Sequence, residues 1–147
     1  AQFRERKMEK TYTGVVHGEI EKDSGTIEAP TSRIAGARKI TVSGIGKYTS
    51  TEFKVILRKK GYTLLELYPK TGRTNQLRVH LLWIGHPVVG DSLYHGQSRK
   101  QRAGLSASRL MLHSKKIVFA HPATGRKTSV ESPLPEDFKK EWKKLTA

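Results

Sequence analysis

The sequence predicts an α+β fold, built from a largely antiparallel mixed sheet with two or three helices. About seven short segments rich in β-branched and aromatic residues are separated by turn signals. Two stretches carry the apolar periodicity of an amphipathic helix, and a charged N-terminal segment is a candidate third. The strands are joined mainly by hairpins rather than by helical crossovers, and this favours antiparallel pairing.

The N-terminal third of the chain predicts one helix end and three strands. The charged segment Ala1–Lys10 is typical of the exposed end of a helix. Strands are expected at Thr11–Val16, Gly25–Ala29 and Ala37–Val42, each followed by turn residues or by proline.

The clearest hairpin lies in the middle of the chain. Thr51–Arg58 alternates apolar and polar residues, Lys60 and Gly61 form the turn, and Tyr62–Tyr68 returns. Pro69 ends the second strand because proline cannot donate to a ladder.

The C-terminal half predicts two helices and another hairpin. Asn75–Ile84 has apolar residues at i, i+4 and i+7, and Gly85 ends it. Ser114–Ala120 and Lys127–Glu131 form the second hairpin. Pro135 then begins a helix with one apolar face, made by Phe138, Trp142 and Leu145.

Composition narrows the classes of function. The 147 residues amount to one domain. Lys and Arg number 28 against 13 Asp and Glu, a formal net charge of +15 that predicts a polyanionic partner such as RNA or DNA. The absence of cysteine excludes disulfides, cysteine-ligated zinc and cysteine nucleophiles.

No segment predicts contact with a membrane. The longest apolar runs, Leu81–Ile84 and Ile117–Ala120, are far too short to span a bilayer. No charged and then apolar leader opens the chain, so we expect a soluble, cytoplasmic protein. The first residue is Ala1 rather than Met, which indicates processing, trimming or a fragment.

Nucleotide-cofactor and metal motifs are incomplete. Gly46-Lys47 invites comparison with a phosphate-binding loop, but the glycine that such a loop needs is replaced by Thr41. The six histidines lack the spacing of a zinc helix. We therefore expect no cofactor and no metal site.

Only three aspartates are available for carboxylate chemistry. Asp23 lies in a turn, and Asp137 lies in the first turn of the last helix, where the helix dipole favours a negative charge. Asp91 follows Gly90 in a tight segment, and capping of a turn is the favoured interpretation over catalysis.

Residues 71–80, Thr-Gly-Arg-Thr-Asn-Gln-Leu-Arg-Val-His, combine a glycine turn, a helix start and two arginines. The free N–H groups of a helix start suit an anion, and Arg73 beside them can hold a phosphate bidentately. Arg78 lies between apolar residues and needs a carboxylate partner, yet positions i−4 and i+4 are Thr74 and Leu82. The alternative is a solvated arginine on an amphipathic helix.

This segment resembles the hallmark of the RluA-type ribosomal and transfer RNA pseudouridine synthases. Further blocks agree with that family in order along nearly the whole chain. These blocks are Gln2–Arg6 with Lys10–Tyr12, Gly46-Lys47 with Thr51–Phe53, Gly85–Tyr94, Arg109–Ser114 with His121-Pro122, and Ser132–Pro135 with Phe138.

The resemblance implies an enzyme that converts uridine to pseudouridine in structured ribosomal or transfer RNA, without a cofactor. It implies that residues 1–147 are the C-terminal portion of the catalytic domain, with no second domain. Tyr12 matches the tyrosine that stacks on the flipped uracil, and Arg78 matches the arginine that pairs with the nucleophilic Asp. Further RNA-binding residues implied by the motif are Arg73, Asn75, Gln76 and His80.

Two departures from the family qualify this expectation. The Arg-Leu-Asp block that carries the nucleophile is absent, so this chain alone is predicted to be inactive and the carboxylate partner of Arg78 is predicted to be missing. Asn75 stands where the family usually has histidine, which removes a titratable ring. A sheet cut after upstream strands would expose an edge, so dimerisation of the chain is a further expectation.

Two other interpretations stay open. The chain is alternatively a catalytically inactive RNA-binding module, since the same charge occurs without a nucleophile. A basic structural protein of the ribosome also fits the composition, but it gives no reason for the pairing of residues 71–80 with residues 85–94.

Overall fold

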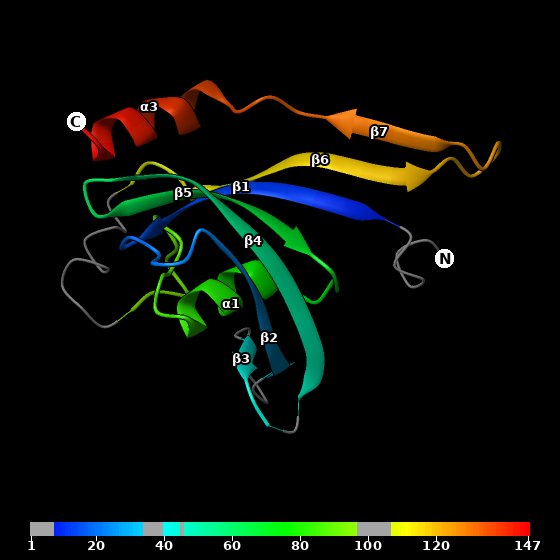
Figure 1. Cartoon of the computed structure of the whole chain (residues 1–147), viewed down its shortest axis with the longest axis horizontal. Coiled ribbons are helices and arrows are strands. Elements are labelled where there is room, and N and C mark those ends of the chain that lie inside the picture. Colours follow the sequence, from blue (N-terminus) through cyan, green and yellow to red (C-terminus); the bar gives the residue numbers. More distant parts are fainter. Residues whose placement is uncertain (1–7, 34–39, 45, 97–106) are drawn as a thin grey trace.

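The computed structural model describes residues 8–33, 40–44, 46–96 and 107–147. Within them, seven strands form one sheet in the order β3-β2-β4-β5-β1-β6-β7, and every pairing is antiparallel (Figure 1). The strands are β1 (Glu9–His17), β2 (Ser24–Arg33), β3 (Ile40–Val42), β4 (Lys47–Lys59), β5 (Tyr62–Pro69), β6 (Leu112–Ala120) and β7 (Lys127–Glu131). The helices are α1 (Gln76–Trp83) and α3 (Glu136–Leu145). The predicted α+β fold with a largely antiparallel sheet is confirmed.

The central hairpin forms as expected. Lys60 and Gly61 have φ angles of 56° and 82°, the left-handed pair that a two-residue hairpin turn requires. The β5 strand ends at Pro69, and the chain then turns into α1, which ends before Gly85 with its φ of 87°. These two connections bring the end of β5 and the start of α1 together.

Several element boundaries differ from the prediction. The β2 strand continues through Pro30 to Arg33 instead of ending at Ala29, and β4 begins at Lys47 instead of Thr51. Glu9 and Lys10 belong to β1, so the expected helix end is wrong for these residues, and positions 1–7 lie outside the described residues. Pairing with β5 and β6 on both sides extends the strand into this charged segment. Of the strand expected at Ala37–Val42, Ile40–Val42 is confirmed and positions 37–39 lie outside the description.

The core lies mainly between the sheet and α1. In Figure 1, α1 lies below β1 and β5 and contacts β2, β3, β4 and β5, whereas α3 lies above β1 and β5, at the level of β7. The apolar face of α3 adds the buried Phe138. The core cluster consists of Val15, Val16, Ile20, Ile27, Phe53, Leu65, Leu67, Leu77, Leu81, Val88, Val89, Met111 and Phe138. Neither described helix is long and apolar enough to cross a lipid bilayer.

Candidate functional site

A cleft of about 190 Å³ opens where β5 passes into α1, against the neighbouring strands β1 and β6. Its lining residues are Lys10, Tyr12, Pro69, Thr71, Gly72, Arg73, Asn75, Gln76, Leu77, Arg78 and Leu112. Residues more than sixty positions apart in the chain thus line one cleft, because β1 lies between β5 and β6 in the sheet.

Tyr12 reaches the cleft from β1. It pairs with Leu67 of β5 and Ser114 of β6, and the β1–β6 register shifts between Thr11 and Tyr12. A bulge of this kind redirects the side chain beside it. Tyr12 is half-buried, so one part of its ring packs and the other is open to a ligand.

Asn75 forms the corner at the start of α1. Its φ of 54° is left-handed, a conformation that asparagine tolerates better than most residues. Its side chain makes no capping bond to the helix. Instead, Oδ1 accepts a hydrogen bond from Arg78 Nη1 at 3.3 Å, and Nδ2 donates to the Tyr94 hydroxyl at 3.4 Å.

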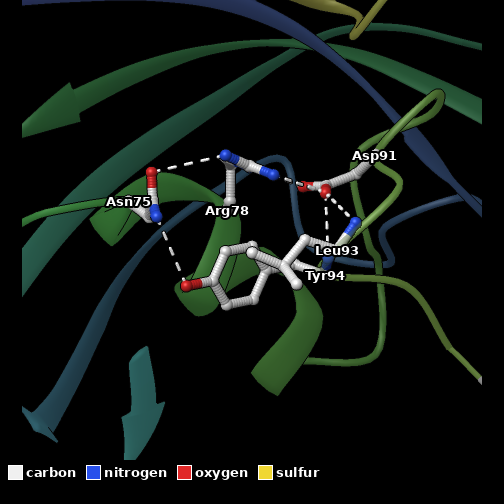
Figure 2. Close-up of polar contacts among 5 residues, drawn as sticks. All are labelled: Asn75, Arg78, Asp91, Leu93 and Tyr94. Carbon is white, nitrogen blue, oxygen red and sulfur yellow. Dashed lines mark hydrogen bonds and ion pairs between the residues drawn. The ribbon is translucent and has the colours of Figure 1, made fainter. Parts of the chain in front are cut away.

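Arg78 is held by Asp91 in a bidentate ion pair (Figure 2). Arg78 Nε donates to Oδ2 and Nη2 donates to Oδ1, both at 2.7 Å. The Asp91 side chain is fully buried and that of Arg78 is 20% exposed. The guanidinium carbon also lies 4.9 Å from the centre of the Tyr94 ring, a cation–π contact.

Asp91 is also the cap of its own turn. Oδ1 accepts the backbone N–H groups of Leu93 at 3.0 Å and Tyr94 at 2.8 Å. Burial opposes ionisation of this carboxyl, but the hydrogen bonds from Arg78 and the two N–H groups outweigh it, and the pKa of Asp91 lies below its ordinary value. The hydrogen bonds to Asp91 likewise raise the pKa of Arg78.

The expectation that Arg78 lacks a carboxylate partner in this chain is therefore wrong. Asp91 is thirteen residues away, and the turn that brings it back lies beyond the helix that carries Arg78. The interpretation of Asp91 as a turn cap is confirmed, and the same carboxylate serves Arg78 as well.

His80 does not fit the expected set of RNA-binding residues. His80 is 0% exposed, and its ring lies between the hydroxyls of Thr49 and Thr51 at 2.6 and 2.9 Å. Burial lowers the pKa of His80 to about 4. His80 therefore has no surface with which to contact RNA.

Gln76 borders the cleft but is only 4% exposed, and its amide is occupied by the protein. Nε2 donates to Ser50 O at 3.0 Å and Thr51 Oγ1 at 2.9 Å. Oε1 accepts the Thr71 hydroxyl at 2.6 Å and the Arg73 N–H at 3.2 Å. Gln76 therefore orders the loop at the cleft through these four hydrogen bonds.

The charge of the cleft is basic. Within the part of the chain that the structure describes, its charged lining residues are Lys10, Arg73 and Arg78, and the lining holds no carboxylate. Arg73 is exposed at the rim, whereas Arg78 lies deeper and is fixed by Asp91. A cleft with an aromatic ring and several cations fits a planar base joined to a phosphate.

Across the part of the chain that the structure describes, no three His, Asp or Glu side chains form a cluster that could hold a metal ion.

Comparison with known proteins indicates one family. The profile of the family described as RNA pseudouridylate synthase matches residues 1–83. The chain is 40% identical over 134 residues to a Bacillus subtilis protein named uncharacterized RNA pseudouridine synthase YlyB, covering 90% of this chain and 43% of that protein. It is 36% identical over 150 residues to ribosomal large subunit pseudouridine synthase C of Escherichia coli, covering 98% and 47%. The chain thus spans less than half the length of these relatives.

Solved structures show the same fold. Human RNA pseudouridylate synthase domain containing 1 superposes with a TM-score of 0.79 at 29% identity, over 91% of this chain and 58% of that one. Human RNA pseudouridylate synthase domain containing 4 gives a TM-score of 0.78 at 22% identity, over 98% and 64%.

Proposed function

The chain belongs to the RNA pseudouridylate synthase family, and we propose that its cleft receives a uridine flipped out of a structured ribosomal or transfer RNA. In this proposal the chain supplies part of the site that isomerises the uridine to pseudouridine. No cofactor takes part, and the protein works in the cytoplasm.

The observation that carries the proposal is the meeting of Tyr12, Arg73, Asn75 and Arg78 in one cleft. Tyr12 comes from one block of the sequence and the other three residues come from the segment 71–80. In the structure they lie on β1, in the loop after β5 and on α1. Their meeting supports a single binding site for a nucleotide rather than scattered basic residues.

Each residue has a physical role in the proposal. Tyr12 stacks on the flipped uracil, and its hydroxyl accepts the proton that leaves C5. Arg73, exposed at the rim, holds a backbone phosphate. Asn75 keeps Arg78 and Tyr94 in place through its side-chain amide.

The reaction conserves atoms and electrons. As the family resemblance implies, an Asp carboxylate attacks C1′ and the N1–C1′ bond breaks. The uracil then turns, and a C5–C1′ bond forms as the Asp–C1′ bond breaks and the carboxylate is released. C5 loses a proton and N1 gains one, so the product is an isomer of the substrate. An oxidant, a reductant and a metal are all unnecessary.

The nucleophilic Asp is the missing component. Among the described residues, no carboxylate lines the cleft, Asp91 is committed to Arg78, and Asp23 and Asp137 pair with Arg58 and Arg109 elsewhere. We propose that the nucleophile comes from an Arg-Leu-Asp block outside these 147 residues, and that residues 1–147 are the C-terminal portion of the catalytic domain. The edge of the Arg78 guanidinium that faces away from Asp91 would then contact the carboxylate of this nucleophilic Asp.

The test uses the complete protein with a uridine-containing ribosomal or transfer RNA fragment. Arg78→Ala should abolish pseudouridine formation while RNA affinity changes little. Arg126→Ala, at an exposed hairpin position, removes the same charge away from the cleft and should keep near-normal turnover. Near-normal turnover in the Arg78 variant would refute the role proposed for this residue.

The second candidate function is a catalytically inactive RNA-binding module. The lack of a carboxylate among the described residues of the cleft lining favours it. The affinity of the 147-residue chain for RNA should fall steeply with salt, because its charge of +15 releases counterions on binding. If the complete protein binds RNA in this way and makes no pseudouridine, the second candidate replaces the first. If the chain fails to bind at low salt, the second candidate is excluded.

We also propose that the isolated chain can dimerise through its sheet edges at β3 or β7. Light scattering that shows only monomer across a concentration series would contradict this.

A further inference from the structure

We propose that His80 is a positioning residue for the cleft, acting as a neutral imidazole protonated on Nε2 within a hydrogen-bond chain from β2 to the loop that carries Arg73. The link to RNA turnover rests on the proposed function. The hydrogen-bond chain itself depends only on contacts within these 147 residues.

The inner half of the hydrogen-bond chain fixes the tautomer of the ring. Thr49 Oγ1 lies 2.5 Å from the Ala29 carbonyl oxygen and 2.6 Å from His80 Nε2. A carbonyl oxygen only accepts, so the single hydroxyl proton of Thr49 goes to Ala29. Thr49 must then accept from His80, and the ring proton is on Nε2.

The outer half runs from the ring to Gln76. Nδ1 of the neutral ring has no proton, so it accepts the Thr51 hydroxyl at 2.9 Å. Thr51 Oγ1 in turn accepts Gln76 Nε2 at 2.9 Å. Ser50 O, another pure acceptor, takes the second proton of the same amide, and this fixes which end of the amide is the nitrogen.

The hydrogen-bond chain ends on the wall of the cleft. Gln76 Oε1 accepts the Arg73 N–H and the Thr71 hydroxyl, and Thr71 Oγ1 accepts the Ser50 N–H at 3.1 Å. Thr71, Arg73 and Gln76 all line the cleft, whereas His80 does not. His80 therefore acts on the cleft only through Thr51 and Gln76.

Because these groups are buried, reversing the direction of one hydrogen bond would leave a partner unsatisfied. Thr49, Thr51 and His80 are 0% exposed and Gln76 is 4% exposed, so water has little access to replace a lost partner. If Nδ1 carried the proton, Thr51 Oγ1 would accept hydrogen bonds from both His80 and Gln76. The hydroxyl proton of Thr51 would then have to find another acceptor. The lowered pKa of His80 agrees with a ring kept neutral near pH 7.

Two substitutions separate the halves of the hydrogen-bond chain. His80→Asn offers an amide oxygen near the Nδ1 position and can still accept from Thr51. His80→Gln offers an amide N–H near the Nε2 position and can still donate to Thr49, but it leaves Thr51 without its acceptor. We expect only His80→Gln to loosen the loop.

The readout is hydrogen exchange of individual amides in the 147-residue chain, without RNA. The Arg73 and Ser50 amides report on the loop, and the Met111 amide, bonded to Val89 O at 2.9 Å, reports on the distant core. Exchange at Arg73 and Ser50 should rise about tenfold in His80→Gln relative to Met111, and much less in His80→Asn.

Several outcomes would overturn the proposal. Nitrogen NMR of the wild-type ring at pH 7 should show the proton on Nε2, and an Nδ1 proton or a charged ring contradicts the assignment. Equal loosening of Arg73 and Met111 in both variants would reduce His80 to core packing. If either variant fails to fold, Thr51→Val, which cuts the outer half, is compared with Thr49→Val, which cuts the inner half. Only Thr51→Val should then loosen Arg73.

In the complete protein, His80→Gln should raise KM for RNA more than it lowers kcat, because the phosphate-holding Arg73 is displaced. The exchange and NMR results need no RNA. An inactive wild-type protein would therefore reject the proposed function and leave the positioning role to be judged on those results.

Discussion

Replacing Asp91 by Asn removes the negative charge opposite Arg78 at nearly constant side-chain volume. Asp91 is fully buried and accepts four hydrogen bonds, two from Arg78 and two from backbone N–H groups. One amide oxygen can still cap the turn, but the amide nitrogen would face an N–H of Arg78. The variant therefore loses the ion pair and adds a donor–donor conflict.

The cost follows from the burial of the pair. Removing one partner of a buried ion pair costs 3–5 kcal/mol as a rule, and we take about 3 kcal/mol because Arg78 keeps 20% of its side chain in water. With a denaturant dependence of about 2 kcal/mol per molar urea for a chain of this size, the unfolding midpoint should fall by about 1.5 M.

The assay is urea unfolding at pH 7 with Asp23→Asn as the matched control. Asp23 also pairs with an arginine, Arg58 at 2.8 Å, but its side chain is 90% exposed, so the control should lose less than about 1 kcal/mol. A loss in Asp91→Asn no larger than in Asp23→Asn would refute the claim that the pair holds the site together.

The same pair has a pH signature. The folded pKa of Asp91 is lowered, so its stabilisation is present above the ordinary carboxyl pKa near 4 and disappears as pH falls through the folded value. The stability difference between wild type and Asp91→Asn should therefore shrink in acid. A difference that stays constant down to pH 2 would contradict the assignment.

Three further predictions concern the cleft and its supports. In the complete protein, Tyr12→Phe should bind RNA normally but lose turnover, whereas Tyr12→Ala should also weaken RNA binding; turnover retained in the Phe variant excludes the hydroxyl as proton acceptor. The pKa of His80 is about 4 in the folded protein and near 6.5 in the unfolded chain, so the free energy of unfolding of the wild type should fall by about 3 kcal/mol as the pH falls from 6.5 to 4. His80→Asn should lack this pH dependence in urea unfolding. Gly90→Ala should reduce stability by over about 2 kcal/mol, because φ is 82° and a Cβ would collide with the Arg109 backbone. Gly125→Ala has a φ of 71° but open space around the added Cβ, so thermal unfolding should show a clearly smaller loss of stability.

Local signals predicted the fold well. The turn at Lys60-Gly61 and the alternation around it specify the central hairpin without reference to the rest of the chain. The charged segment before Thr11 carried no such signal, because Glu9 and Lys10 become a strand through partners in β5 and β6 that are distant in sequence.

The site was only partly predictable, for a similar reason. The ion pair of Arg78 with Asp91 depends on how the turn after α1 folds back, which spacing along a helix does not reveal. For His80 a signal existed. It lies three residues after Leu77 and four before Ile84, on the apolar face of the helix, so its position predicted burial although its residue type invited an RNA contact. Its partners Thr49 and Thr51 follow from the placement of β4 beside α1, which no local pattern encodes.

The left-handed backbone at Asn75 has a consequence for how this position can vary. Among residues with a Cβ, asparagine, aspartate and histidine enter that conformation most readily. Exchange of histidine for asparagine thus keeps the geometry of the corner and gives up only the ionisable ring. Glycine would fit the corner equally well but would remove the amide that bonds Arg78 and Tyr94, while Asp91 would still hold the guanidinium. Asn75→Gly therefore separates what the main chain requires from what the side chain contributes.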